Sequence, residues 1–206
     1  NKMAFFIDSS GRSYTLLANS LPSARGQGEP LTGRLTPPIG AEFIDVVMGD
    51  DEQLVILSSD AGYGFISTLG DLQSKTKSGK HAITLSKEAK TMRLTKVQNL
   101  ESDYLAVITN RARLLIFQVS ELPHLSKGKG NKLINIKTDD FVAKEEFLIG
   151  LCIIKEHQKL RVEYGNGKKH KQYSFSDLVN FTSHRARKGL TVPGVHGKAL
   201  GIDAIG

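Results

Sequence analysis

The chain has 206 residues, 39% of them hydrophobic, and its 28 lysines and arginines against 21 acids give a formal net charge of +7. This size and composition predict one soluble globular domain, and they exclude a membrane span because no apolar run approaches ~18 residues. The single cysteine, Cys152, excludes an internal disulfide, and its apolar surroundings predict a buried core thiol in a reducing compartment.

Four β-hairpins are predicted in chain order. In each, two runs rich in β-branched and aromatic residues flank a turn that carries glycine or asparagine. The hairpins join residues 5–8 to 13–17, 54–57 to 63–66, 104–108 to 114–117, and 160–164 to 172–175.

Each hairpin is followed by an anchor leucine and then by a basic loop that contains glycine. The anchors are Leu21, Leu72, Leu122 and Leu178, spaced by 51, 50 and 56 residues. The first to fourth basic loops are residues 23–28, 75–80, 127–130 and 185–189. Glycine admits φ > 0 and the close approach of another molecule, while the lysines and arginines supply positive charge. A further strand is expected after each loop, most clearly at residues 81–85 and 133–136.

A repeat of about 50 residues with about four strands per unit is typical of propeller-like arrays. We therefore predict an all-β, β-pinwheel-like fold with about four four-stranded blades, in an open or incomplete ring. The chain is expected to form a single domain, 1–206, with blades at roughly 1–51, 52–102, 103–157 and 158–206. A β-sandwich is the alternative fold, and the absence of tryptophan excludes the WD repeat. Because the chain begins Asn1-Lys2 without an initiator methionine, we expect a fragment of a longer protein.

Residues 94–100 and 141–154 are expected to connect successive units. Beside the second of these lies the main acidic cluster, Asp139, Asp140, Glu145 and Glu146. Paired carboxylates can serve in acid–base catalysis or hold a metal, but no histidine or third ligand follows at a suitable spacing. The cluster is therefore interpreted as a solvated loop.

Motifs that carry catalysis are missing from the sequence. There is no phosphate-binding P-loop, no G-x-S-x-G, no C-x-x-C and no H-E-x-x-H, and the G-x-G pairs lack a third glycine. The six histidines are scattered, so they are interpreted as surface or phosphate-contacting residues. We expect no catalytic residue, no metal site and no cofactor in this domain.

The basic loops predict contact with an extended polyanion. On equivalent corners of successive blades they would form a curved positive band, able to hold bent duplex DNA through phosphate contacts. The candidate DNA-binding residues are Arg25, Lys75, Lys77, Lys80, Lys127, Lys129, Lys132, Arg185, Arg187 and Lys188. Secondary candidates are Arg34, Lys168, Lys169 and Lys171. Few aromatic residues lie between these charges, which argues against a platform for single strands.

Residues 6–14, 21–33, 59–65 and 125–132 carry a family resemblance. They look like the C-terminal domain of the A subunit of bacterial topoisomerase IV, and the resemblance covers essentially the whole chain. It implies a β-pinwheel whose blades exchange strands, with a basic rim that binds and bends the DNA segment to be passed through the enzyme's gate. It also implies that the domain tunes decatenation and supercoil relaxation.

The same resemblance implies the partners and the cellular location. The partners are double-stranded DNA, the N-terminal part of the same polypeptide, which carries the catalytic tyrosine, and the B subunit in an A2B2 assembly. The ATP and Mg²⁺ of the parent enzyme belong to other domains. No membrane is involved, and the location is the cytoplasm, on the bacterial chromosome.

Two alternatives stay open. The related gyrase domain carries a Gln-Arg-Arg-Gly-Gly-Lys-Gly type box, and its nearest counterparts here, residues 24–28 and 126–130, are degenerate, although a first-blade box could precede Asn1. A propeller that docks partner proteins, with incidental basic charge, is the alternative function.

Overall fold

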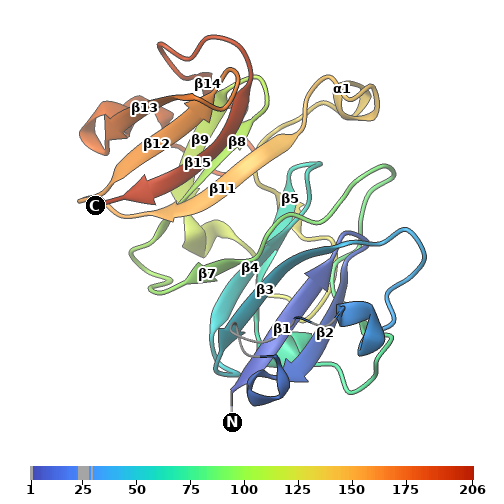
Figure 1. Ribbon diagram of the computed structural model, residues 1–206. Helices are drawn as coiled ribbons and strands as arrows, with labels where there is room; N and C mark the ends of the chain where they lie inside the picture. Colours follow the sequence, from blue (N-terminus) through green and yellow to red (C-terminus); the bar gives the residue numbers. More distant parts are fainter. Residues whose placement is uncertain (1, 23–27, 29) are drawn as a thin grey trace.

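The computed structural model describes residues 2–22, 28 and 30–206. Within these residues fifteen strands form four antiparallel sheets that follow one another as blades (Figure 1). Three sheets have four strands and the fourth has three. The all-β β-pinwheel predicted from the sequence is confirmed.

All four predicted hairpins are present. They are β1 (Met3–Asp8) with β2 (Arg12–Leu17), β4 (Leu54–Ser58) with β5 (Tyr63–Thr68), β8 (Tyr104–Thr109) with β9 (Arg113–Gln118), and β12 (Lys159–Tyr164) with β13 (Lys169–Ser174). Most of the middle residues of the first three hairpins are buried, whereas β12 is buried at alternate positions and β13 has no buried residue.

One further strand pairs with the first strand of each hairpin, on the inner side of the arc. These inner strands are β3 (Phe43–Gly49), β7 (Thr95–Val97), β11 (Leu148–Ile154) and β15 (Ala199–Ile205). The expectation that 94–100 and 141–154 are connections was wrong, since they contain β7 and β11. The apolar run of β11 lacks the alternation of a half-buried strand because both of its faces are packed: Leu151 and Ile153 lie against one hydrophobic cluster, and Ile149 and Cys152 lie against another.

The fourth strand of a sheet is short and comes from the following repeat of the sequence. These exchanged strands are β6 (Lys80–His81), β10 (Asn131–Lys132) and β14 (Leu190–Thr191), which pair with β2, β5 and β9. The strand expected at 81–85 begins one residue earlier and is shorter, and the strand expected at 133–136 was misplaced, since the strand lies at residues 131–132; both begin directly after the loop glycine. Ile83 and Leu133 beyond them are fully buried and belong to the core.

Hydrophobic clusters fill the spaces between successive sheets. Ile56 of the second sheet, for example, belongs to one buried cluster with Leu105 and Leu115 of the third. The anchor leucines Leu72 and Leu122 are also buried. Short helices fill the connections: η1 (Ala18–Ser20), η2 (Leu31–Gly33), η3 (Gly70–Leu72), η4 (Val119–Glu121), η5 (Ser176–Phe181) and α1 (Thr138–Val142). None of the helices in the described ranges is long enough to cross a membrane.

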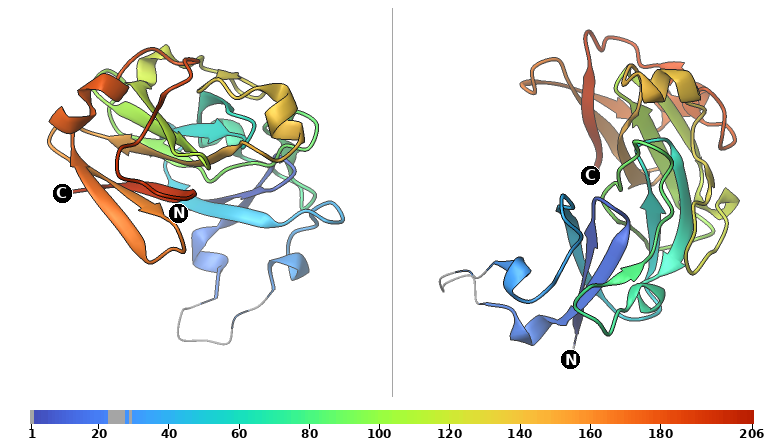
Figure 2. Two further views of the ribbon diagram at one scale, coloured as in Figure 1. Left: turned by 90° about the horizontal axis from the view of Figure 1, so that it is seen from above. Right: turned by 90° about the vertical axis from the view of Figure 1, so that its right-hand side faces the viewer.

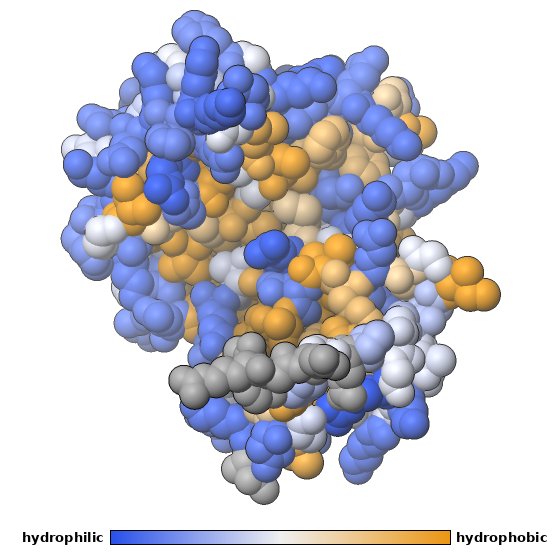
Figure 3. Space-filling model, viewed as in Figure 1, coloured by the Kyte–Doolittle hydropathy of each residue, from blue (hydrophilic) through white to orange (hydrophobic). Residues whose placement is uncertain are grey.

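The four sheets follow a C-shaped arc, in which the first and last sheets face each other across a hollow (Figure 2). Hydrophobic side chains gather in this hollow (Figure 3). A cavity of about 310 Å³ there is bordered by Ile44 of β3, Leu151 of β11 and Ile202 of β15. Val46 and Met48 of β3 are 48% and 44% exposed.

The last glycine of three basic loops docks the exchanged strand against the preceding hairpin. Gly130 has φ of +80°, and a Cβ atom on it would lie 2.1 Å from the carbonyl oxygen of Gly64. The equivalent glycines, Gly79 and Gly189, have φ of +73° and +74° and similar clashes. Only glycine combines this left-handed backbone with so close an approach.

Replacing Gly130 with alanine should therefore destabilise the fold by about 2–3 kcal/mol. Alanine is strained in the left-handed backbone conformation of this residue, and its Cβ atom would push the exchanged strand β10 away from Gly64. Thermal unfolding monitored by circular dichroism measures the loss. Gly33→Ala is the matched control, because Gly33 lacks a positive φ and a Cβ there meets nothing within 4 Å. Equal stability of the two variants would contradict the docking role of Gly130.

Candidate nucleic-acid interface

The second, third and fourth basic loops lie in succession along one edge of the arc. Backbone hydrogen bonds join each of these loops to the segment that follows the preceding basic loop in the sequence. The links are Thr36 N–H to Lys77 O at 2.8 Å, Thr84 N–H to Gly128 O at 2.9 Å, and Asn135 N–H to Arg187 O at 2.9 Å. Two return bonds, Gly128 N–H to Ala82 O and Ala186 N–H to Leu133 O, complete the last two links. The backbone therefore fixes the spacing of the loops.

The candidate residues fall into two groups by exposure. Six are exposed: Lys75, Lys77, Lys127, Lys129, Arg187 and Lys188. These side chains project from three successive loops, so the structure brings them together on one rim. Arg25 of the first basic loop lies outside the described residues.

The remaining primary candidates are half-buried and bonded within the chain. Lys80 Nζ donates to the carbonyl of Asp71 at 2.6 Å, and Lys132 Nζ donates to the side chain of Asn135 at 3.3 Å. Arg185 Nη1 donates to the Lys132 carbonyl at 3.1 Å. These three side chains contribute charge to the rim while also holding the loops in place.

The secondary candidates lie in two places. Arg34 lies in the first repeat, where its Nη1 donates to the carbonyl of Ser20 at 2.8 Å and its Nη2 donates to the Ser20 hydroxyl at 2.9 Å. Lys168, Lys169 and Lys171 are exposed at the tip and second strand of the fourth hairpin.

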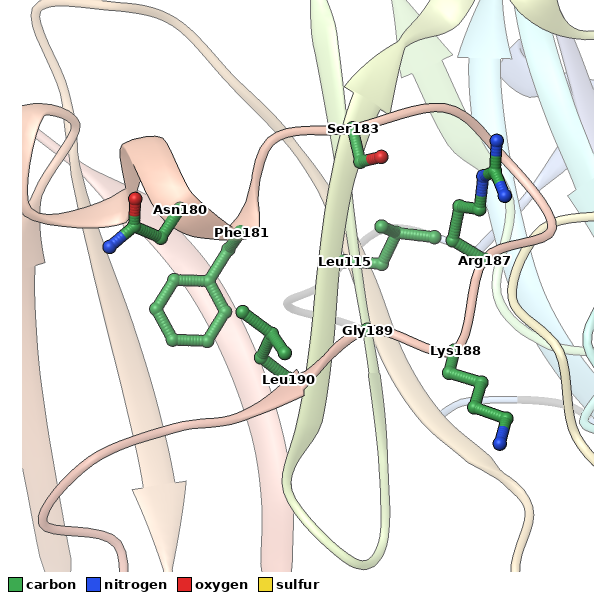
Figure 4. Close-up of a pocket in the computed structure, with 8 residues that line it drawn as sticks. All are labelled: Leu115, Asn180, Phe181, Ser183, Arg187, Lys188, Gly189 and Leu190. Carbon is green, nitrogen blue, oxygen red and sulfur yellow. The ribbon is translucent and has the colours of Figure 1, made fainter.

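The fourth loop frames a shallow hollow of about 390 Å³ (Figure 4). Phe181 and Leu190 face each other on its apolar side, and Leu190 is 52% exposed. The side chains of Arg187 and Lys188 point in opposite directions along the edge, so one loop presents two separate charges.

Two arginines hold the basic loops, and each is the first residue in the second strand of a hairpin: Arg12 in β2 and Arg113 in β9. Neither was among the residues predicted to bind DNA. Arg12 Nε and Nη2 donate to the carbonyls of Ser78 and Gly79, both at 2.9 Å. Arg113 Nη1 donates to the carbonyl of Lys188. The signal available in the sequence was their common position, directly after the hairpin turn.

Tyr63 occupies the same position in the second hairpin and uses different chemistry. The ammonium of Lys129 lies over the Tyr63 ring, 4.1 Å from its centroid. A cation–π contact leaves the charge of the lysine in place, so Lys129 is both held and available to an anion.

Glu146 corrects the interpretation of the acidic cluster as a solvated loop. Asp139 and Glu145 are exposed as expected, but Glu146 is only 2% exposed. It accepts hydrogen bonds from Arg113 Nε at 2.8 Å, Arg113 Nη2 at 2.6 Å and Thr109 Oγ1 at 2.9 Å. Burial alone would raise the pKa of Glu146, but the bonds from Arg113 and Thr109 and the charge of Arg113 lower it overall. Glu146 is thus an ionised structural partner of Arg113.

The remaining reactive side chains show no catalytic arrangement in the part of the chain that the structure describes. Cys152 is half-buried, and burial, with a smaller effect from Asp203, raises the pKa of its thiol to about 12, so it is not a nucleophile at neutral pH. All six histidines are exposed, which confirms their interpretation as surface residues. Among the described residues no group of histidine, cysteine and acidic side chains is placed to hold a metal ion.

Comparison with known proteins gives consistent similarities. The family model of the DNA gyrase C-terminal domain, a β-propeller, matches residues 53–97 and 103–144. The chain is 46% identical over 193 residues to the A subunit of DNA topoisomerase 4 of Pseudomonas aeruginosa and 42% identical over 195 residues to that of Escherichia coli K12. These alignments cover 94% and 95% of the chain but 25% and 26% of the relatives, so the chain spans about a quarter of their length.

Solved structures of the same kind of domain are also similar to this chain. The C-terminal domain of E. coli ParC has a TM-score of 0.88 and 40% identity, with all of this chain and 82% of that chain covered. A DNA gyrase A C-terminal domain has a TM-score of 0.75 over the whole of this chain and 66% of its own, and at 14% identity it supports the fold alone.

Proposed function

The chain belongs to the family of C-terminal domains found in the A subunits of bacterial topoisomerase IV and gyrase, and from this premise we propose that it binds duplex DNA for a type II topoisomerase. The basic rim captures the duplex through its phosphates and bends it along the arc. The bent duplex is the transported segment that the enzyme passes through its gate. In this way the domain tunes decatenation and supercoil relaxation without a catalytic step of its own.

The observation that supports this proposal most strongly is the backbone linkage of the basic loops. Because three loops are tied in succession, their exposed charges form one band instead of isolated patches. The primary rim residues are Lys75, Lys77, Lys127, Lys129, Arg187 and Lys188, with Arg25, Lys80, Lys132 and Arg185 in support and Arg34, Lys168, Lys169 and Lys171 as secondary contacts. A curved band of this kind matches a bent polyanion.

The energetics favour such a complex. Bending a 20–30 base-pair site costs on the order of 1–6 kcal/mol. Binding to phosphates releases condensed counterions, and this term alone supplies most of the affinity of sequence-independent binding. Three linked loops supply enough exposed cations to offset the bending cost.

The parent assembly follows from the same premise. We propose that this domain acts beside the N-terminal part of its own polypeptide, which holds the catalytic tyrosine, and beside the B subunit in an A2B2 assembly. ATP and Mg²⁺ serve those other parts. The proposed location is the cytoplasm, on the bacterial chromosome.

A salt titration tests the DNA-binding proposal. Fluorescence anisotropy with a labelled duplex of about 30 base pairs should show log K falling linearly with log salt, with a slope of about −0.9 per phosphate contacted. Binding that is insensitive to salt, or absent, would overturn the proposal and favour a propeller that docks proteins.

The sequence tolerance of binding provides a second test. Replacing Lys127 and Lys129 with alanine should weaken binding to several unrelated duplexes by a similar factor and reduce the salt slope by about 2. A loss confined to one sequence would contradict phosphate binding by the third loop. The Lys96→Ala variant is the control, since exposed Lys96 lies on the inner strand β7.

A further inference from the structure

We propose that Arg12 and Arg113 are positioning residues of the DNA-binding rim, which act on DNA through the backbone of the basic loops and not by direct contact. This inference rests on the proposed function. Each arginine holds the backbone of one basic loop and so orients the exposed lysines and arginines of that loop toward DNA. Arg12 serves the second loop, and Arg113 serves the fourth.

Arg12 makes a two-point contact with the second loop. Its Nε donates to Ser78 O and its Nη2 to Gly79 O, each at 2.9 Å, across 66 and 67 residues of sequence. These carbonyls lie between the exposed Lys77 and the exchanged strand β6. A guanidinium that bonds two successive carbonyls fixes the orientation of that peptide segment, and the lysines that precede it are oriented as a result.

Arg113 joins the third and fourth repeats. Its Nη1 donates to the carbonyl of Lys188, and its Nη2 donates both to the carbonyl of Asn135 at 3.0 Å and to Glu146 Oε1 at 2.6 Å. The side chain of Glu146 is 3% exposed, while that of Arg113 is 19% exposed. Since Asn135 N–H also donates to Arg187 O, the arginine closes a network around the base of the fourth loop.

Neither arginine is arranged as a phosphate ligand. The donors of Arg12 named above point at loop carbonyls, and those of Arg113 are divided between carbonyls and a carboxylate. Both residues are half-buried, unlike the exposed Lys77 and Lys188. The geometry therefore separates side chains that hold a loop from side chains that the loop presents.

A double-mutant cycle on the second loop tests the assignment. Arg12→Met, Lys75→Gln/Lys77→Gln and the triple variant are compared for affinity to a duplex of about 30 base pairs. Arg12→Met alone should weaken binding about 3–10-fold and reduce the salt slope by about 1–2. In the Lys75→Gln/Lys77→Gln background the same replacement should have almost no further effect, because the side chains that it positions are absent. The matched control is Arg111→Met. Arg111 is an exposed arginine that pairs with Asp140 and Glu145 and holds no basic loop, so this variant removes the same charge elsewhere.

Hydrogen exchange of the DNA-free chain provides a readout that does not depend on binding. Arg12→Met should speed exchange of the amides in residues 75–79 while those in 127–130 keep their rates, and Arg12→Lys should restore part of the protection. Unchanged exchange in 75–79 would overturn the positioning role.

The outcomes separate the inference from the proposed function. Additive losses in the cycle would mean that Arg12 contacts phosphate directly, and an equal loss in Arg111→Met would mean that charge alone matters; either result overturns the inference. Loop loosening without any change in affinity also overturns it while leaving DNA binding intact. If Lys75→Gln/Lys77→Gln itself binds normally, the proposed DNA-binding role of this loop fails, and the inference fails with it.

Discussion

A chain in which Lys75, Lys77, Lys127 and Lys188 are all glutamine should bind duplex DNA at least about 100-fold more weakly at about 0.1 M salt, because about four counterion-releasing phosphate contacts are lost. The four side chains are exposed, so their removal should leave thermal stability nearly unchanged. The salt slope should fall by about 3 to 4. Anisotropy titrations at several salt concentrations measure both quantities.

The control for this variant has the same net charge but keeps the rim. Lys2, Lys96, Lys144 and Lys159 are also exposed and lie outside the basic loops, and their replacement by glutamine lowers the formal charge from +7 to +3 as well. The rim variant should bind far more weakly than this control. Equal affinities would show that binding follows net charge and not the arrangement of the loops.

Replacing Glu146 with alanine should reduce the free energy of unfolding by about 3 kcal/mol, because a buried ion pair loses one partner. Arg113 would keep its carbonyl contacts but lose two bonds to the carboxylate, and Thr109 would lose its acceptor. For a chain of this size the melting temperature should fall by about 6–12 °C. Calorimetry or circular dichroism measures the shift.

Glu145 offers the matched control one residue away. Its side chain is 58% exposed and lies 3.4 Å from Arg111, so Glu145→Ala should cost less than about 1 kcal/mol. Comparable losses for the two alanine variants would contradict the structural role of Glu146.

The pH dependence of the Glu146 effect follows from the lowered pKa. The folded pKa lies below the ordinary glutamate value, so ionised Glu146 stabilises the fold fully above about pH 4.3. This stabilisation is lost as the pH falls through the folded pKa. The difference in stability between the parent chain and Glu146→Gln should therefore be largest at neutral pH and shrink below about pH 4. A difference that grows in acid would mean that the carboxyl is protonated in the folded chain.

Local patterns in the sequence predicted the hairpins and the loops. The hairpins could be found because turn residues separate β-branched runs, and the loops because Gly79, Gly130 and Gly189 recur behind buried leucines. Both features depend on residues that are close in sequence, where backbone preferences act directly.

Non-local contacts could not be predicted in the same way. Residues 141–154 were expected to be a connection, whereas residues 148–154 form β11, which pairs with β8 and packs against the distant β15. Glu146 looked like part of a solvated cluster because its partner, Arg113, lies 33 residues away. The roles of Arg12 and Arg113 are hidden for the same reason, since the loop carbonyls that accept their hydrogen bonds lie 66 to 75 residues further along the chain.

The exchanged strands have a consequence for how the chain folds on the ribosome. Strand β2 gains its outer neighbour only when Lys80 and His81 have emerged, and β9 waits in the same way for Leu190 and Thr191. Each new blade thus completes the one made before it, so the nascent chain always carries one unfinished sheet edge near the exit tunnel. A stop codon or ribosomal stall in a later repeat therefore damages the blade already synthesised as well as the missing one.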